Sequence, residues 1–471
     1  MQKETIKLKE KIGYGFGDLA SSMFWKIFGM YLLFFYTDVF GISAAAAGTL
    51  FLITRAFDAI TDPAMGMIAD RTKSRWGKYR PYLLYISVPF AIVGAFTFFT
   101  PDFSTNGKLI YAFITYNLMM MVYTAINIPY ASLLGVMSPN PNERNILSSY
   151  RMSFAFIGSF ITFMILQPLI DYFGKGGQIS VNEGISTEPL AWTKAVAIIG
   201  VICIIFFYLC FRFTKERVVQ IEKSAEKTSV KKDLKLLFKN KPWWILVATG
   251  LAALMFSALR DTVAVYYFKY YIIDSYKMQI TGWTLTTVYF LISQAANLVG
   301  VMMAPALSKK FGKKKTYIIA MIIASVFSCG FFFTKDIAII IMLQIIIAIA
   351  AGYVLPLLWS MFSDICDHQE LTTGRRASGL IFSSSSMSQK FGWAIGPAIV
   401  AWMLAFFGYI NPVGASETVV QPDSAIYCMR LLISLLPAVA GILASIGMFF
   451  YPLSDKRVNE IAKELEDKRN N

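Results

Sequence analysis

Residues 337–362 read IAIIIMLQIIIAIAAGYVLPLLWSMF and contain no Asp, Glu, Lys or Arg. A helix of about 20 such residues crosses the hydrocarbon layer of a bilayer. No water reaches the backbone N–H and C=O groups there, so the segment must satisfy them internally, as a helix does. This stretch therefore predicts a membrane-spanning helix.

The rest of the chain has the same character. Of its 471 residues, 56% are hydrophobic and only 15% are charged, whereas soluble domains carry charge at about a quarter of their positions. Twelve stretches of about 20 or more mostly apolar residues are apparent. They are residues 13–38, 44–69, 80–100, 108–136, 151–173, 190–212, 243–268, 280–306, 316–334, 337–362, 378–408 and 427–452. We expect an all-α polytopic membrane protein with twelve transmembrane helices.

The positive charge of the chain predicts its orientation. There are 44 Lys and Arg against 29 Asp and Glu, a net charge of +15, and such an excess can indicate a nucleic-acid partner. Here the basic residues concentrate in alternate loops and at both ends, notably in residues 70–80, 212–241 and 309–315. Basic loops mark the cytoplasmic side of a membrane protein. We therefore expect a plasma membrane protein with both termini in the cytoplasm and no nucleic-acid partner.

Two halves of the chain resemble each other. The loop Gly66–Lys78 follows the second apolar stretch, and the similarly basic loop Leu307–Lys315 follows the eighth, about half the chain length later. Parallel repeats of this kind are typical of secondary transporters, whose substrate site lies near the membrane midplane between the repeats. The predicted divisions are a six-helix half at 1–213, a cytoplasmic linker at 214–242, a second six-helix half at 243–455 and a cytoplasmic tail at 456–471.

Charged residues inside the apolar stretches indicate function. A charge near the bilayer centre costs roughly 2.5–3.5 kcal/mol on insertion scales, so it needs a partner or a wet cavity. Asp58 and Asp62 lie four residues apart on one helix face, and Arg55 precedes Asp58 by three. Carboxylates that close repel each other, so one holds a proton unless a cation lies between them. Oxygen ligands suit hard cations, so the pair predicts a Na⁺ or H⁺ site. The structural alternative is an Arg55–Asp58 ion pair, which would leave Asp62 unpaired.

A lysine and a tryptophan share a polar face in the eleventh stretch. Lys390 and Trp393 follow Ser383 and Ser386 at helical spacing. Serines can simply pack closely between membrane helices, but this does not explain the lysine. A lysine in the membrane implies an acidic partner, and the second helix provides the candidate.

The first stretch carries a second polar face, made of Asp18, Ser22, Trp25 and Lys26. A carboxylate, a hydroxyl and an indole are what a sugar site uses, since they bind hydroxyls and cover an apolar ring face. The alternative is that Trp25 is an ordinary membrane aromatic residue.

Four other charged positions are ambiguous. Arg260 and Asp261 are adjacent and cannot face each other on one helix, so each should have its own partner. Lys269 and Arg430 lie near helix ends, where a long side chain can extend to the membrane interface.

Several motifs match a known family. They are Tyr14-Gly-Phe-Gly17, Phe35-Tyr-Thr-Asp38, Arg55-Ala-Phe-Asp58-Ala-Ile-Thr-Asp62-Pro63, Arg75-Trp-Gly-Lys-Tyr-Arg-Pro81, Tyr123-Thr-Ala-Ile-Asn127-Ile-Pro129-Tyr130 and Asp364-Ile-Cys-Asp367-His-Gln-Glu370-Leu-Thr-Thr-Gly374-Arg-Arg376. The chain resembles the glycoside–pentoside–hexuronide:cation symporters of the major facilitator superfamily, of which melibiose permease is the best-known member. The resemblance covers nearly the whole chain.

The resemblance implies a twelve-helix fold with two six-helix halves and uptake of a sugar or glycoside together with Na⁺, H⁺ or Li⁺. It places a Na⁺ site at Asp58 and Asp62, with Thr124 and Asn127 nearby. Lys390 and Arg55 would couple this site to the substrate. Arg151 matches a sugar-binding arginine of the family. Together with the polar faces described above, the expected substrate-binding residues are Asp18, Ser22, Trp25, Asn127, Arg151, Lys390 and Trp393.

The sequence departs from melibiose permease in the sugar site. Ser21-Ser22 stand where that protein has Lys-Asp, Asn127 replaces a sugar-binding aspartate, and Ala131 replaces a tryptophan. Our hypothesis is that Asp18, one turn before Ser22, replaces the lost carboxylate.

The expected protein is a monomeric symporter without a cofactor, whose partners are a small sugar or glycoside, a monovalent cation and the lipid bilayer. Asp70, Arg71 and Arg75 would form its cytoplasmic gate. The alternatives are a transporter of a lipid or other amphiphile with the same fold, and a membrane-embedded enzyme. An enzyme would need a nucleophile–base pair or a metal cluster, which one histidine and scattered cysteines do not provide.

Overall fold

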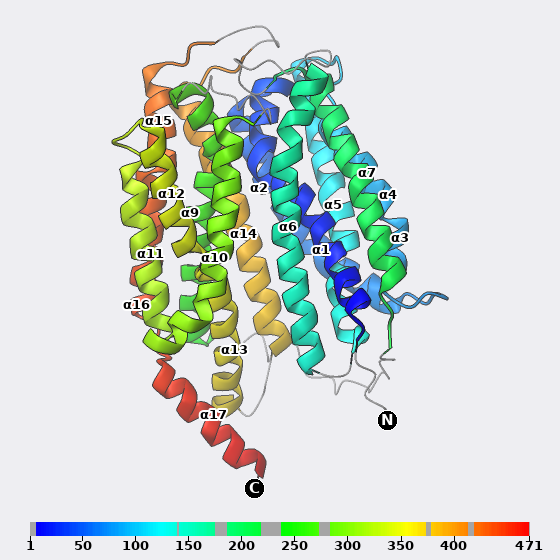
Figure 1. Cartoon of the computed structure of the whole chain (residues 1–471), viewed down its shortest axis with the longest axis vertical. Helices are drawn as coiled ribbons and strands as arrows, with labels where there is room; N and C mark the ends of the chain where they lie inside the picture. Colours follow the sequence, from blue (N-terminus) through cyan, green and yellow to red (C-terminus); the bar gives the residue numbers. More distant parts are fainter. Residues whose placement is uncertain are drawn as a thin grey trace. The chain divides into compact units, whose positions relative to one another are not determined.

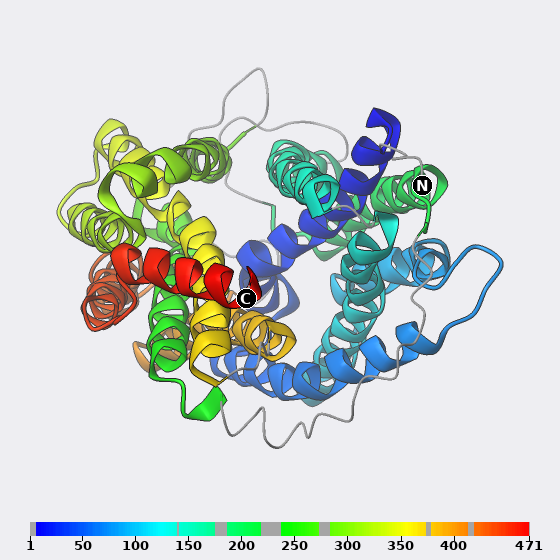
Figure 2. The same cartoon turned by 90° about the horizontal axis from the view of Figure 1, so that it is seen from below.

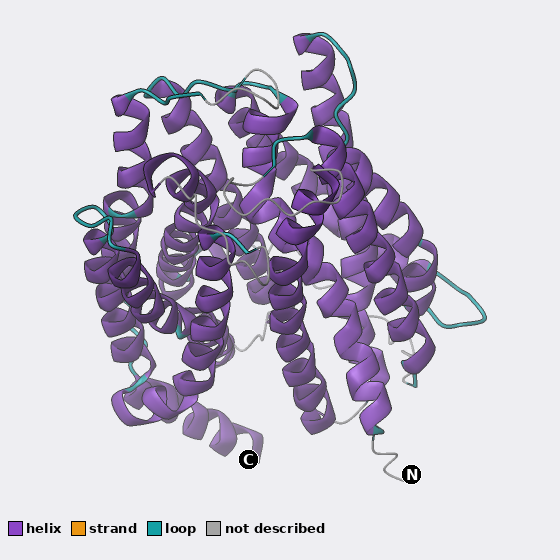
Figure 3. Ribbon diagram, turned by 45° about the horizontal axis from the view of Figure 1, so that its top comes forward, coloured by secondary structure: helices purple, strands orange, loops and turns teal. Residues whose placement is uncertain are grey.

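The computed structural model describes residues 6–138, 141–174, 186–217, 237–272, 283–373, 378–412 and 419–470. Within these ranges the chain forms helices joined by turns and loops (Figure 1 and Figure 3). The first half contains α1 (Leu8–Phe34), the π-helical segment η1 (Phe35–Phe40), α2 (Ala44–Arg71), α3 (Arg80–Tyr85), α4 (Ser87–Thr97), α5 (Thr105–Met137), α6 (Pro141–Gly174) and α7 (Pro189–Phe213). The second half contains α9 (Lys241–Tyr266), the π-helical segment η2 (Tyr267–Ile272), α10 (Leu285–Phe311), α11 (Lys313–Gly330), α12 (Ile337–Gly352), α13 (Val354–Thr373), α14 (Ser378–Phe406), α15 (Asp423–Ile433), α16 (Leu435–Phe449) and α17 (Asp455–Asn470).

The predicted fold class is confirmed, because each of the twelve apolar stretches coincides with a helix or with consecutive helices. In the described part of the chain, eight helical segments meet strict length and hydropathy criteria for crossing a membrane. The bounds differ where polar residues prolong a helix past the apolar part. Thus α6 begins at Pro141 rather than at 151, and the 337–362 stretch divides near Tyr353 into α12 and α13, the latter ending at Thr373.

The chain forms two compact units that do not follow chain order. The first comprises Met1–Ile221, Phe268–Leu291 and Ala401–Ala425, and the second comprises Glu222–Tyr267, Ile292–Val400 and Ile426–Asn471. The first unit therefore includes two segments from the second half of the sequence. The division at 213 and 243 concerns the chain order of the repeats and stays a prediction.

In the first unit, α1 packs along α6 and α7 (Figure 1 and Figure 2). The α1–α6 approach is close enough that a Cβ atom at Gly158 would clash with the backbone carbonyl of Leu19. Small residues allow membrane helices to approach in this way. This contact therefore holds α6 beside the part of α1 that carries Asp18.

An acidic residue caps the helix that follows the first basic loop. Gly77 has a φ angle of 108°, a conformation that other residues rarely adopt. The Glu216 carboxylate, three residues past α7, accepts hydrogen bonds from the backbone N–H groups of Lys78 (2.8 Å), Tyr79 (2.8 Å) and Arg80 (3.0 Å). These groups lie at the start of α3, where helices leave N–H groups without partners and favour negative charge.

The second unit repeats this arrangement. Gly312 also has a positive φ angle, 86°. The backbone N–H of Lys313, at the start of α11, donates to the Asp455 carboxylate at 3.1 Å. Asp455 follows the last apolar helix, as Glu216 follows α7. A positive-φ glycine with an acidic cap therefore recurs about half the chain length later, which supports the predicted duplication.

One buried arginine connects α9 to three other helices of the second unit. Arg260 of α9 donates to Ser328 Oγ at 2.7 Å, to Gln344 Oε1 at 2.6 Å and to the backbone carbonyl of Ile433. Its guanidinium also lies 4.4 Å from the centre of the Phe331 ring. Arg260 therefore has partners on other helices, as the sequence predicts, whereas a separate partner for Asp261 stays a prediction.

Replacing Glu216 with Ala should lower the free energy of unfolding by about 2 kcal/mol, because three N–H groups lose a charged acceptor. Thermal unfolding of the purified protein in detergent measures this. Lys215→Ala is the matched control, since Lys215 is the exposed preceding residue. Equal stability of the two variants would contradict the role of the cap.

Candidate functional site

The acidic pair of α2 is held by two different partners. Arg55 Nη1 lies 2.7 Å from Asp58 Oδ2, and both side chains are only 9% exposed. Thr124 of α5 donates its hydroxyl to Asp62 Oδ1 at 2.9 Å. The structural alternative given in the sequence analysis, an Arg55–Asp58 ion pair with Asp62 unpaired, is therefore correct only in its first part. The Arg55–Asp58 ion pair exists, but Asp62 has a partner on another helix.

The carboxylates and the Thr124 hydroxyl provide hard oxygen ligands. Nearby, the Asn127 side-chain amide donates to the backbone carbonyl of Tyr123 at 3.1 Å, which turns its nitrogen toward its own helix. Among the residues the structure describes, no group of three or more His, Cys, Asp or Glu side chains is placed to hold a metal ion. A cation at Asp58 and Asp62 would thus depend on hydroxyl, carbonyl or water oxygens besides the two carboxylates.

Arg55 also contacts the aromatic part of the site. Its guanidinium carbon lies 5.8 Å from the centre of the Trp25 ring, within cation–π range. Its Nη2 lies 3.5 Å from the Tyr116 hydroxyl. Trp25 in turn packs against Tyr123, with ring centres 5.5 Å apart. One side chain therefore contacts Asp58 of the acidic pair and Trp25 of α1.

Asp18 forms an ion pair with Arg151. Arg151 Nε lies 2.7 Å from Asp18 Oδ2, and Nη2 lies 3.4 Å from Oδ1. This two-point contact fixes the planes of both groups. The Arg151 guanidinium also lies 5.1 Å from the Tyr130 ring centre. Tyr130 stacks on Tyr14 with ring centres 4.8 Å apart and donates its hydroxyl to the Tyr14 carbonyl at 2.7 Å.

The structure brings the α1 face and Arg151 together, as the sequence predicts separately for each. Arg151 remains 28% exposed despite its ion pair, while Ser22, Trp25 and Lys26 are half-buried on the same side of α1. A guanidinium, a carboxylate, a hydroxyl and an indole are thus available to a ligand rich in hydroxyl groups. Such groups donate and accept hydrogen bonds, and the indole covers an apolar ring face.

Two further predicted site residues belong to the second unit. Lys390 and Trp393 are half-buried on α14 in the second unit, and the side chains of Ser383 and Ser386 fall outside the described residues. The joint action of Lys390 and Trp393 with the α1 and α2 residues stays a prediction.

The predicted gate also stays a prediction. Arg71 and Arg75 are exposed, and the Arg75 guanidinium lies 4.2 Å from the Trp76 ring centre. The side chain of Asp70 is outside the described residues.

Two features were not predicted from the sequence: the α5 tyrosines that contact Arg55, Trp25 and Arg151, and the ion pair between Asp38 and Lys269. Tyr116, Tyr123 and Tyr130 recur at seven-residue spacing along α5, which places them on one helix face, and that spacing could have been noticed. The sequence named no partner for Lys269, whose ammonium lies 2.9 Å from the fully buried carboxylate of Asp38. Arg430 donates to the Phe332 carbonyl at 2.6 Å. That these two side chains reach the membrane interface stays a prediction.

Comparisons with known proteins identify relatives of this chain. A family model described as MFS/sugar transport protein matches residues 13–455. The inner membrane symporter YicJ of Escherichia coli (strain K12) is 34% identical over 469 residues, covering 99% of this chain and 96% of that protein. The isoprimeverose transporter of Lactiplantibacillus pentosus is 34% identical over 471 residues, covering 99% and 93%.

A solved structure shares the fold. The bacterial homologue of the human lysosomal transporter Spinster superposes with a TM-score of 0.68 at 13% identity, covering 96% of this chain and 98% of that one. At this identity the similarity concerns the fold alone.

The Asp18–Arg151 pair should be cooperative in stability. Asp18→Asn and Arg151→Gln should each destabilise the protein by about 2 kcal/mol, because each leaves a partly buried charge without its partner. The double variant should lose clearly less than the sum, and thermal unfolding of the four proteins gives this coupling. Simple additivity would show that the two side chains do not interact.

Proposed function

The chain belongs to the glycoside–pentoside–hexuronide:cation symporter family of the major facilitator superfamily, and we propose that it takes up a glycoside by symport with Na⁺. It is a multi-pass membrane transporter. We further propose that transport is inward and that the protein lies in the bacterial inner membrane with both termini in the cytoplasm. The working unit is proposed to be a monomer that requires no cofactor.

The observation that carries the proposal is the double contact of Arg55. Its guanidinium is bound to Asp58 and lies over Trp25. Na⁺ at Asp58 and Asp62 would compete with Arg55 for the Asp58 carboxylate, because both are cations that need the same oxygens. A shift of Arg55 would then change its contact with Trp25, which belongs to the proposed substrate site.

Coupling follows from this competition by linkage. If Na⁺ increases the affinity for the sugar, the sugar must increase the affinity for Na⁺ by the same factor. Thr124 contributes by orienting the Asp62 carboxylate. Lys390 is the proposed second coupling cation, because a lysine in a membrane helix needs an acidic partner.

The substrate site proposed here is centred on Asp18, Arg151 and Trp25. The other members are Ser22, Asn127, Lys390 and Trp393. Because Arg151 is already neutralised by Asp18, the pair favours a neutral glycoside or pentoside over a hexuronate, whose carboxylate would have to displace Asp18. Asp70, Arg71 and Arg75 are proposed to close the cytoplasmic side.

Uptake into proteoliposomes tests the proposal. An inward Na⁺ gradient should drive accumulation of at least one member of a panel of neutral glycosides, pentosides and hexuronates. Accumulation driven only by a pH gradient would replace Na⁺ with H⁺ as the coupling ion. No accumulation of any panel member under either gradient would contradict sugar symport.

Thr124→Val should weaken the stimulation of sugar binding by Na⁺, because the Asp62 carboxylate loses the hydroxyl that orients it. The expected loss of Na⁺ affinity is about tenfold, equivalent to one hydrogen bond to a charged group. Isothermal titration of the purified protein with Na⁺ measures it directly.

Thr115→Val is the matched control, since Thr115 lies on the same helix but donates to the Tyr111 carbonyl of its own helix. Equal Na⁺ affinities of the two variants would remove Thr124 from the cation site.

A further inference from the structure

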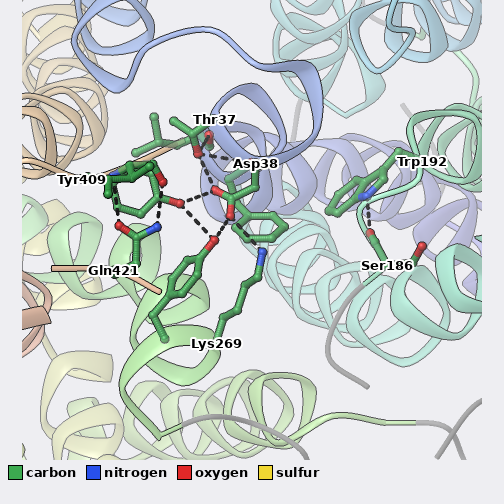
Figure 4. Close-up of polar contacts among 11 residues, drawn as sticks. Thr37, Asp38, Ser186, Trp192, Lys269, Tyr409 and Gln421 are labelled. Atoms are coloured by element: carbon green, nitrogen blue, oxygen red, sulfur yellow. Dashed lines mark hydrogen bonds and ion pairs between the residues drawn. The ribbon is translucent and has the colours of Figure 1, made fainter. Parts of the chain in front are cut away.

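Another buried acid lies where the first helix ends, far from the N-terminus. Asp38 belongs to η1, and its side chain is fully buried. Figure 4 shows its carboxylate at the centre of a polar cluster. Lys269 Nζ lies 2.9 Å from Oδ1, the Tyr409 hydroxyl donates to Oδ2 at 2.6 Å, and the Tyr270 hydroxyl donates to Oδ1. Thr37 adds a fourth donor at 2.7 Å.

Three of these four donors come from the second half of the sequence. Lys269 and Tyr270 lie in η2, directly after α9, and Tyr409 lies just after α14. Both segments belong to the first compact unit, whereas α9 itself and most of α14 belong to the second. We call Asp38, Lys269, Tyr270 and Tyr409 the Asp38 latch.

Further hydrogen bonds hold the same segments in the first unit. The Asn411 side chain donates to the Ile42 carbonyl at 2.7 Å. The Gln421 side chain binds both the N–H and the carbonyl of Ile410, at 3.0 and 2.7 Å, next to Tyr409. On α6, Gln167 accepts from the Thr284 hydroxyl at 2.6 Å and from the Thr287 hydroxyl. These hydrogen bonds therefore tie the chain after Tyr409 to the loop after η1, and the start of α10 to α6.

The donor set explains why Asp38 tolerates complete burial. A buried carboxylate is costly unless it is paired and hydrogen-bonded, and here a cation and three hydroxyls satisfy its two oxygens. If η2 and the segment after α14 moved away, Asp38 would lose three of its four donors. Because this end of the helix lies next to a loop, water can replace them, so the contact can break reversibly. A charge at the membrane midplane would lack that compensation.

We propose that the Asp38 latch is the gate that closes the substrate path on the membrane face opposite the N-terminus. α1 continues directly into η1, so the helix that carries Asp18 and Trp25 also carries the latch. Substrate entry from outside the cell would require the latch to open. This inference rests on the proposed uptake by symport, from which it takes the direction of substrate entry.

Thiol labelling tests the latch without sugar or cation. Ile42 is 1% exposed, and its side chain makes none of the latch hydrogen bonds, so Ile42→Cys reports opening at this end. The background carries Cys329→Ser, because the other four native cysteines are buried. In right-side-out vesicles, Tyr409→Phe and Asp38→Asn should each accelerate labelling by a membrane-impermeant maleimide about tenfold, equivalent to ~1.4 kcal/mol.

Glu10→Gln is the matched control. It breaks a similarly buried ion pair, Glu10–Arg217, near the other end of α1, and it should leave the labelling rate unchanged. Equal rates in wild type, Tyr409→Phe and Asp38→Asn would overturn the proposal, as would acceleration only in inverted vesicles. Tyr409→Phe keeps the ring and covers the case in which Asp38→Asn fails to fold. Failure of sugar uptake by the wild type would be a separate result, because labelling requires no transport.

Discussion

The buried ion pair between Arg55 and Asp58 is the interaction on which the functional account depends. Within an apolar helix a carboxylate must be neutralised by a proton, a metal ion or a basic side chain. In this structure the basic side chain does so, at 2.7 Å. The same guanidinium lies over Trp25, so a change in what neutralises Asp58 changes the surroundings of an aromatic residue on the neighbouring helix.

The first helix connects the three polar clusters of the first unit. Asp18 pairs with Arg151, Trp25 contacts Arg55, and α1 runs directly into η1, where Asp38 binds Lys269. Close packing against α6 limits how far α1 can move independently, since Gly158 lies directly against the backbone of Leu19. A movement of this helix would therefore displace the proposed substrate-binding residues and the Asp38 latch together.

Much of this was predictable from sequence, for physical reasons. Uninterrupted apolar runs such as 337–362 predict membrane helices, and the i, i+4 spacing of Asp58 and Asp62 predicts a shared face. Partners across helices are different, because spacing along one helix says nothing about which side chain faces it from another. The pairing of Asp18 with Arg151, and of Asp38 with Lys269 across 231 residues, needed the three-dimensional structure. The acidic cap Glu216 was hidden for the same reason, in a loop that composition identifies only as polar.

The most direct measurement compares sugar affinity with and without saturating Na⁺ in wild type and in Arg55→Gln. The account predicts that Na⁺ strengthens sugar binding by the wild type. In the variant, Na⁺ and sugar should each still bind, but the ratio of the two sugar dissociation constants should fall to about one, because coupling is a property of the linked pair. A variant that retains the wild-type ratio would contradict the role of Arg55 as the link between the acidic pair and the substrate site.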